Sequence, residues 1–241
     1  MTAENGEKIA LVTGSTSGIG RATAEMLGES GYHVVVTGRD AERGQLVCQN
    51  IIDANGKADF FEADLTQQEQ AQRLVDFAAS LGELAVLVNC VGGNKPHTST
   101  DQLFAINYRA PLFVMEAALN YMKSGSSIVN VTSICSESKQ AHEGGAYSDF
   151  KAAITSATYG LTADLARQGI RINIVAPGLT ETPDTQHITG KGRQDLARDM
   201  PLSQRFLDPH EVAQVICNVA EWPYVTGQTV IVDGGMTAVN G

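Results

Sequence analysis

The chain has 241 residues, of which 43% are hydrophobic and 18% charged, with a formal net charge of -10 and a pI of about 4.9. Its length allows one large α/β domain with a stable core. The acidic balance argues against nucleic acid or an anionic membrane as a partner, because either would require a clustered basic face. The apolar runs are too short to span a bilayer and the first residues show no signal peptide, so we expect a cytoplasmic protein.

The cysteines and histidines give no indication of a metal site. Cys48, Cys90, Cys135 and Cys217 form no C-x-x-C pair, and the five histidines are scattered. No Cys/His cluster has the spacing of zinc ligands. We therefore expect reduced thiols and no bound metal.

The first strand and helix enclose a Gly-rich turn. The apolar run KIALVT at residues 8–13 predicts a buried parallel strand, and the turn GSTSGIG at 14–20 leads into a helical stretch. This is the context of a dinucleotide-binding loop, because glycines let a pyrophosphate approach the free N–H groups at a helix N-terminus. Ser15, Thr16 and Ser17 can add hydroxyl donors.

The second strand and its exit loop occupy residues 32–40 and end in Gly38-Arg39-Asp40. The residue at this exit meets the ribose next to adenine, where an acidic side chain would repel a 2′-phosphate. A small residue followed by Arg39 leaves room for a phosphate and supplies a permanently charged donor. The pattern favours NADP(H) over NAD(H). In the alternative, Arg39 is solvated and Asp40 binds the ribose.

Strand and helix patterns continue to alternate along the chain. Further strands are predicted within residues 58–66, 83–93, 126–133, 169–183 and 224–236, and further helices within 41–56, 103–122 and 208–221. We predict a single doubly wound Rossmann domain over residues 1–241, with about seven parallel strands flanked by helices. Ligands of such sheets bind at the carboxyl ends of the strands, where Ser133 ends the fifth strand.

Tyr147 and Lys151 stand four residues apart at the start of a long helix-compatible run. Positions i and i+4 share one face of a helix, so a phenol and an ammonium would point into the same space. A nearby cation favours the phenolate and lowers the pKa of a tyrosine, which proton transfer at a carbinol or carbonyl requires. In isolation, the same pair is also typical of an ordinary helix surface.

Four motifs in order resemble those of the short-chain dehydrogenase/reductase family. They are T-G-x-x-x-G-x-G at 13–20, Asn89-Cys90-Val91-Gly92 where the family usually shows N-N-A-G, Ser133 at a strand end, and Tyr147-x-x-x-Lys151. The resemblance covers residues 8–237, with 3-oxoacyl-carrier-protein reductases among the similar members. It implies hydride transfer between a nicotinamide cofactor and a carbonyl or secondary alcohol carbon.

The resemblance also implies the roles of individual residues. Tyr147 exchanges a proton with the substrate oxygen, Lys151 tunes Tyr147 and holds the nicotinamide ribose, and Ser133 hydrogen-bonds the same substrate oxygen. Asn107 holds a local helix distortion and a water leading to the lysine. The implied cofactor residues are Gly14, Ser15, Ser17, Gly18, Ile19, Gly20, Arg39, Asp64, Leu65, Asn89, Val91, Gly92, Tyr147, Lys151, Pro177, Gly178, Thr180 and Thr182.

Several of these assignments have alternatives. Asp64 could contact the adenine ring or only support a helix cap at Thr66. Cys90 and Val91 replace the usual N-A pair, which makes the cofactor wall bulkier. A catalytic role for Cys90 is disfavoured, because no base is paired with it in the sequence.

The loops around the site differ from the family. The loop at 93–102 is shorter than usual, which would open the substrate pocket, and the stretch between Ser133 and Tyr147 is one residue longer. Ser136 and Ser138 in this stretch are minor rivals of Ser133. His142 and Glu143 either contact the substrate or form a solvated pair, and 184–206 resembles a mobile substrate loop.

Other functions remain open from the sequence. The fold could serve a catalytically silent nucleotide-binding regulator or scaffold, or the enzyme could be an NAD-dependent alcohol or diol dehydrogenase. A carrier-protein substrate would require a basic dock near the site, for which Lys123 and Arg171 are candidates. The resemblance implies a homotetramer, or a homodimer, in which the helices of Asn107 and Tyr147 pack between subunits. The remaining expected partner is a small carbonyl or alcohol substrate.

Overall fold

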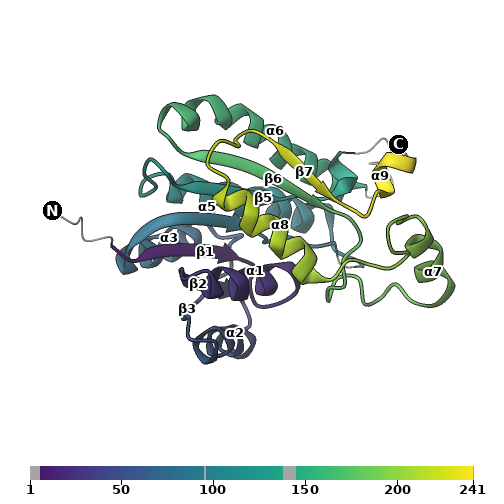
Figure 1. Cartoon of the computed structure of the whole chain (residues 1–241), viewed down its shortest axis with the longest axis horizontal. Helices are drawn as coiled ribbons and strands as arrows, with labels where there is room; N and C mark the ends of the chain where they lie inside the picture. Colours follow the sequence, from purple (N-terminus) through teal and green to yellow (C-terminus); the bar gives the residue numbers. More distant parts are fainter. Residues whose placement is uncertain (1–5, 95, 138–144, 241) are drawn as a thin grey trace.

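The computed structural model describes residues 6–94, 96–137 and 145–240. Seven parallel strands form one sheet in the order β3-β2-β1-β4-β5-β6-β7 (Figure 1). They are β1 (Lys8–Thr13), β2 (His33–Gly38), β3 (Lys57–Glu62), β4 (Glu83–Asn89), β5 (Ser127–Val131), β6 (Arg171–Pro177) and β7 (Thr229–Val232). The prediction of a doubly wound α/β fold with about seven parallel strands is confirmed.

Helices cover both faces of this sheet (Figure 1). The main ones are α1 (Gly18–Glu29), α2 (Ala41–Asp53), α3 (Gln68–Leu81), α5 (Ala110–Ala118), α6 (Ala146–Arg167) and α8 (Pro209–Glu221). One apolar cluster joins α1, α2 and α8 to strand residues such as Val12, and the other joins α3, α5 and α6 to residues such as Leu11. Because successive strand residues face opposite layers and both layers are apolar, the strands appear in the sequence as continuous apolar runs.

The strand order reverses between β1 and β4, which both pair in parallel with their neighbours. A crevice forms at such a reversal, at the carboxyl ends of the strands. A buried polar chain crosses the sheet there. Thr13 donates to Asn89 (3.4 Å), Asn89 Nδ2 donates to Asn130 Oδ1 (2.9 Å), and Asn130 donates to Thr158 Oγ1 (2.9 Å). These bonds satisfy buried polar groups and tie together the strands that flank the crevice.

The helix predicted at 103–122 is divided into three parts. A capping box at Ser99 and Gln102 starts α4 (Thr100–Phe104), a π-helical turn follows at Ala105–Arg109, and α5 then continues. A π-turn inserts one extra residue and is common at functional sites. The family-based expectation of a local helix distortion at Asn107 agrees with this turn.

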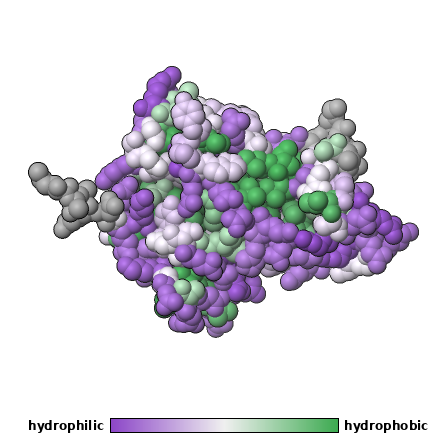
Figure 2. Space-filling model, in the orientation of Figure 1, coloured by the Kyte–Doolittle hydropathy of each residue, from purple (hydrophilic) through white to green (hydrophobic). Residues whose placement is uncertain are grey.

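Other element boundaries differ from the prediction. The strand expected within 224–236 is confined to Thr229–Val232, because the preceding residues bond β6 through Thr226 Oγ1 and the Val225 carbonyl. The region 184–206 contains a helix, α7 (Gly190–Arg198), that the sequence analysis did not predict. No residue of α7 is buried, and Figure 2 shows the lobe around it as strongly hydrophilic beside a patch of apolar surface.

Within the described ranges, no helix is long and apolar enough to cross a membrane. A search of the same ranges finds no group of three or more His, Cys, Asp or Glu side chains that could hold a metal ion.

Candidate active site

A cavity of about 460 Å³ opens at the carboxyl ends of the central strands. Its wall combines the Gly-rich loop, the end of β4, the end of β5, the start of α6 and the segment after β6. The predicted site residues in this wall are Gly14, Ser17, Gly18, Ile19, Gly20, Gly92, Ser133, Tyr147, Lys151, Pro177, Gly178, Thr180 and Thr182. Segments far apart in sequence therefore meet at the edge where parallel sheets bind ligands.

The Gly-rich loop suits a pyrophosphate. Ser17 is the N-cap of α1, yet its side chain makes no capping hydrogen bond, and the first turn contains no acidic residue. Gly18 has a φ of 54°, and a Cβ added to Gly20 would lie 2.4 Å from the carbonyl oxygen of Gly14. The loop is thus closed tightly by glycines, and a helix N-terminus without a side-chain cap faces the cavity, which favours an anion there.

In three predicted cofactor residues, the side chain bonds or packs against other parts of the protein. Ser15 Oγ donates to the carbonyl of Val12 (2.6 Å) and accepts from the N–H of Thr37 (2.9 Å). Leu65 packs into the apolar cluster, and the Asn89 amide belongs to the buried polar chain. The expectation that the Ser15 hydroxyl adds a donor to the loop is therefore wrong, because this hydroxyl fastens the loop to β2. Only backbone atoms of these residues remain for a ligand.

Asp64 supports the chain turn that precedes α3. Its Oδ1 accepts from the N–H (3.1 Å) and the hydroxyl (2.8 Å) of Thr66, while the N-cap of α3 is Gln67 rather than Thr66. The alternative in which Asp64 is a supporting residue therefore has direct structural evidence. Val91 donates its N–H to Thr13 Oγ1 (3.1 Å) and packs beside Gly14 and against an apolar cluster, so it is not among the described residues that line the cavity.

At the end of β2, the Asp40 side chain has hydrogen-bond and ion-pair partners within the described residues, whereas the Arg39 side chain has none. Asp40 is the N-cap of α2: its Oδ1 accepts from the N–H of Arg43 (3.1 Å) and its Oδ2 lies 3.1 Å from Arg43 Nε. Arg39 is exposed, and among the described residues it has no hydrogen bond or ion pair. Because Asp40 is occupied by the helix cap, the alternative in which it binds the ribose is disfavoured.

Asn107 is fully buried in the π-turn and clamps the peptide of Gly93. Its Nδ2 donates to the carbonyls of Gly93 (3.0 Å) and Leu103 (3.1 Å), and its Oδ1 accepts from the Gly93 N–H (3.0 Å). A Cβ added to Gly92 would lie 2.8 Å from both Asn107 Oδ1 and Lys151 Nζ. Gly92 therefore leaves the space in which the Asn107 and Lys151 side chains approach each other.

Lys151 lies one turn after Tyr147 on α6 and is 5% exposed. Its Nζ donates to the Val131 carbonyl at the end of β5 (3.0 Å) and lies 5.9 Å from the centroid of the Tyr147 ring. Burial lowers the pKa of Lys151 from 10.5 to about 8. Because burying an ammonium is costly, its charged form is stabilised by each oxygen atom that accepts a hydrogen bond from it.

The expected effect of Lys151 on Tyr147 is wrong for this structure. The pKa of Tyr147 is raised above its ordinary value of 10, chiefly by burial, with a smaller contribution from Cys135. A hydrogen bond from Ser133 acts in the opposite direction, and the negative charge of Asp184 adds to the increase. Desolvation thus outweighs any effect of the Lys151 cation, whose Nζ lies over the ring at 5.9 Å from its centroid. Tyr147 is accordingly a neutral phenol at pH 7.

Ser133 is distinguished from its described rival by geometry. Its Oγ accepts from the Cys135 N–H (3.2 Å), and Ser133 is close enough to Tyr147 to act on its pKa, which it lowers against the larger effect of burial. Ser136 Oγ instead donates to the Ser133 carbonyl (2.6 Å), inside a short 3-10 turn at Ile134–Ser136. The other rival, Ser138, and the loop pair His142 and Glu143 lie outside the described residues.

Two further sequence expectations can be judged from the structure. Cys90 lines the cavity, but burial raises its pKa to about 12, so it is a thiol rather than a nucleophilic thiolate. Arg171 does not form a dock near the site, because its guanidinium donates to the carbonyls of Ala220 and Trp222 at the end of α8. Arg171 is the first residue of β6, and Lys123 precedes β5. Both therefore lie at the amino ends of the strands, opposite the cavity.

The sequence analysis missed several residues of the cavity wall. They are Gly93, Asn94, Val131, Thr132, Ile134, Cys135, Leu179, Pro183, Asp184, Thr185, His187, Ile188, Leu196 and Met236. Most come from the variable segment after β6 and from the C-terminal region, where no motif fixes the position of a side chain. The acidic residue two positions after Thr182 was visible in the sequence and could have been proposed.

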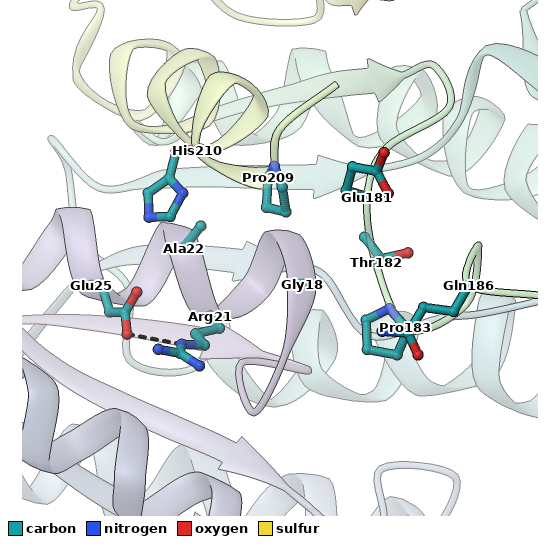
Figure 3. Close-up of a pocket in the computed structure, with 10 residues that line it drawn as sticks. All are labelled: Gly18, Arg21, Ala22, Glu25, Glu181, Thr182, Pro183, Gln186, Pro209 and His210. Atoms are coloured by element: carbon teal, nitrogen blue, oxygen red, sulfur yellow. Dashed lines mark hydrogen bonds and ion pairs between the residues drawn. The ribbon is translucent and has the colours of Figure 1, made fainter. Parts of the chain in front are cut away.

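A second cavity, of about 300 Å³, lies beside the segment that contains Thr182 and Pro183 (Figure 3). It is lined from α1 and the start of α8, and it shares Gly18, Thr182 and Pro183 with the larger cavity. Its charged groups are already paired, as for Arg21 Nε and Glu25 Oε1 at 2.9 Å. The larger cavity, with the half-buried Tyr147 and the buried Lys151, is therefore the candidate active site.

Comparison with known proteins agrees with this geometry. The model of the enoyl-(acyl carrier protein) reductase family matches residues 14–237. The chain is a short-chain dehydrogenase/reductase. It is therefore an oxidoreductase of carbonyl and alcohol groups that uses a nicotinamide cofactor.

Several relatives of this family are similar over their full length. A cis-4-hydroxycyclohexanecarboxylate dehydrogenase of Sinomonas cyclohexanicum is 35% identical, covering 97% of this chain and 98% of the relative. A 3-oxoacyl-(acyl-carrier-protein) reductase of Thermotoga maritima is 32% identical, covering 95% and 97%. The crystal structure of an actinorhodin polyketide ketoreductase variant with NADPH superimposes with a TM-score of 0.85 at 27% identity, covering 96% and 97%.

Proposed function

We propose that this enzyme reduces a carbonyl to a secondary alcohol with NADPH, and catalyses the reverse reaction, through Tyr147, Lys151, Ser133 and Asn107. The supporting observation is that these four residues lie close together beside one cavity. A Cβ on Gly92 would meet both Asn107 and Lys151, and Ser133 and Tyr147 line the same cavity as Lys151. A protein that only binds nucleotide has no need of this complete set, which argues against a silent regulator.

The residues divide the work as follows. A bound nicotinamide supplies or accepts the hydride. Tyr147, held as a neutral phenol by burial, donates its proton to the substrate oxygen as the carbonyl is reduced. Ser133 donates a hydrogen bond to the same oxygen and stabilises the charge that develops there. Lys151 binds the ribose hydroxyls of the cofactor, and Asn107 supports the route by which Tyr147 regains a proton.

The preference for NADP(H) is also part of the proposal. Arg39 is exposed and unpaired within the described ranges, next to Gly38 at the end of β2, and can bind a 2′-phosphate. The similar ketoreductase structure contains NADPH. An NAD-dependent alcohol or diol dehydrogenase is the alternative, and it would be recognised by equal or tighter binding of NADH.

For the substrate, we propose a ketone small enough to enter the 460 Å³ cavity without a carrier protein. Carrier docking would need basic side chains near the mouth, whereas Lys123 and Arg171 stand at the opposite edge of the sheet. The arginines of α7 are also engaged, Arg193 with Glu181 and Arg198 with Asp195. The relative that acts on a cyclohexane alcohol makes cyclic ketones a suitable first panel.

The proposed function is tested by replacing Tyr147 with phenylalanine. NADPH oxidation is measured over a panel of linear and cyclic ketones, and NADPH binding is measured by fluorescence. We expect Tyr147→Phe to abolish turnover while NADPH still binds, because the proton donor is lost and the cavity is preserved. The matched control is Tyr159→Phe on the same helix, whose hydroxyl bonds Thr229 (2.7 Å) away from the cavity. Turnover that persists in Tyr147→Phe would refute the mechanism.

We also propose a homotetramer, or a homodimer, built on the face of α4 and α6. Phe104 is 36% exposed and packs against Tyr108 and Phe150, with ring centroids 5.5 and 5.3 Å apart. Only six residues of the long helix α6 are buried in the single chain. Covering such an aromatic face would remove it from water. Light scattering of the purified protein tests this proposal, and a monomeric mass would contradict it.

A further inference from the structure

Among the described residues that line the catalytic cavity, Asp184 is the one carboxylate. It lies on the segment between β6 and α7 and is partly buried. A Cβ added to Gly93 would lie 2.5 Å from Asp184 Oδ2, so the carboxylate is in contact with the peptide that Asn107 clamps. No hydrogen bond or ion pair within the described part of the chain satisfies Asp184.

The charge of Asp184 lies in the same cavity wall as Tyr147 and Lys151. Burial raises the pKa of Tyr147 and lowers that of Lys151; the negative charge of Asp184 adds to the first shift and offsets part of the second, so it lies close to both groups. Lys151 Nζ donates to the Val131 carbonyl, and within the described residues no ion pair joins Lys151 to Asp184. A partly buried carboxylate without a donor is costly, and a ligand that supplies one would relieve this cost.

Several of the other described residues that line the cavity are apolar. Leu179, Ile188, Leu196 and Met236 line it, together with the exposed His187. An apolar pocket with one fixed polar group binds a compact hydrocarbon skeleton and selects the position of one substituent. In this cavity the fixed group is an anion.

We infer that Asp184 is a specificity-determining residue that selects ketones bearing an ammonium or another hydrogen-bond donor and rejects ketones bearing a carboxylate. This inference rests on the proposed function and names its substrate class. A donor on the substrate would form a charge-assisted hydrogen bond with Asp184, whereas a second carboxylate in the same space would be repelled.

Three ring ketones of similar size test the inference, each substituted para to the carbonyl. They are protonated N-methylpiperidone, methylcyclohexanone and oxocyclohexanecarboxylate, which are cationic, neutral and anionic. For the wild type we expect kcat/KM to fall in this order, by about tenfold at each step for a partly exposed charge pair. In Asp184→Asn the three values should converge. Asp199→Asn, which removes an exposed carboxylate just after α7, should keep the wild-type order.

Ratios between probes separate recognition from chemistry, because any change in the proton transfer affects all three ketones alike. Binding of the same probes to the Tyr147→Phe variant with NADPH, measured by calorimetry, gives the order without turnover. Equal binding of the three probes in this complex, or failure of the cationic probe to bind, would overturn the inference. So would an Asp184→Asn defect that falls on NADPH affinity alone. Ketone reduction that survives Tyr147→Phe would instead refute the proposed function.

Discussion

Replacing Gly92 by alanine perturbs the packing between Asn107 and Lys151. The added Cβ would lie 2.8 Å from Asn107 Oδ1 and from Lys151 Nζ, whereas ordinary contact begins at 3.4 Å, so the two atoms must retreat by about 0.6 Å. Asn107 is held by three hydrogen bonds to Gly93 and Leu103, so the flexible end of Lys151 moves. Because Gly92 has a φ of 158°, alanine should cost some stability, and displacement of the proposed catalytic Lys151 by a fraction of an ångström should lower kcat by roughly 10- to 100-fold.

The assay is steady-state NADPH oxidation with the preferred ketone, combined with thermal unfolding of the same preparations. Gly160→Ala is the control, because Gly160 is exposed on α6 and an added Cβ meets nothing within 4 Å. That control should keep its kcat and gain roughly 0.5 to 1 kcal/mol from the higher helix propensity of alanine. Unchanged kcat in Gly92→Ala would refute the reasoning, as would a loss of activity that only follows a loss of folded protein.

Three further outcomes follow from the structure. Arg39→Gln should weaken NADPH binding by roughly 10- to 100-fold with little effect on NADH, because a charge-assisted hydrogen bond to the 2′-phosphate is lost; equal weakening of both cofactors would contradict the role of Arg39. Asn89→Leu should lower the free energy of unfolding by roughly 2 to 3 kcal/mol, because the buried partners Thr13 and Asn130 lose hydrogen bonds, and denaturant unfolding measures it. The pKa of Lys151 falls from 10.5 in the unfolded chain to about 8 in the fold, so the unfolded state binds more protons between these values and stability rises with pH. Relative to Lys151→Met, the wild type should gain up to about 3 kcal/mol as the pH is raised from 8 to 10.5, and a parallel pH dependence of the two proteins would contradict this sign.

The sequence was informative wherever backbone geometry dictates the residue type. A tight turn before α1 demands the glycines at positions 14, 18 and 20, and buried parallel strands demand continuous apolar runs, so both were predictable. The spacing of Tyr147 and Lys151 likewise follows from helix periodicity. These constraints are local, and one sequence suffices to recognise them.

The sequence was less informative where an outcome depends on competing long-range terms. Burial and a cation act in opposite directions on the Tyr147 pKa, and only the arrangement of α6 against β5 decides that burial prevails. Ser15 looked like a ligand donor until its contacts with Val12 and Thr37 placed its hydroxyl inside the fold. Asp184 belongs to a segment without periodic pattern, so only the tertiary structure brings it to Gly93.

The π-turn at Ala105–Arg109 limits how this chain can change in length. Removing its extra residue would rewind the turn into an α-helix and rotate everything after it by about 100°, the angle between successive helical residues. Asn107 would leave Gly93, and the buried face of α5, including Val114 and Met115, would turn away from the core. A one-residue deletion there cannot remove the Asn107 amide from Gly93 without also unpacking α5 from the sheet, so variants that lose only this amide should arise by substitution rather than by deletion.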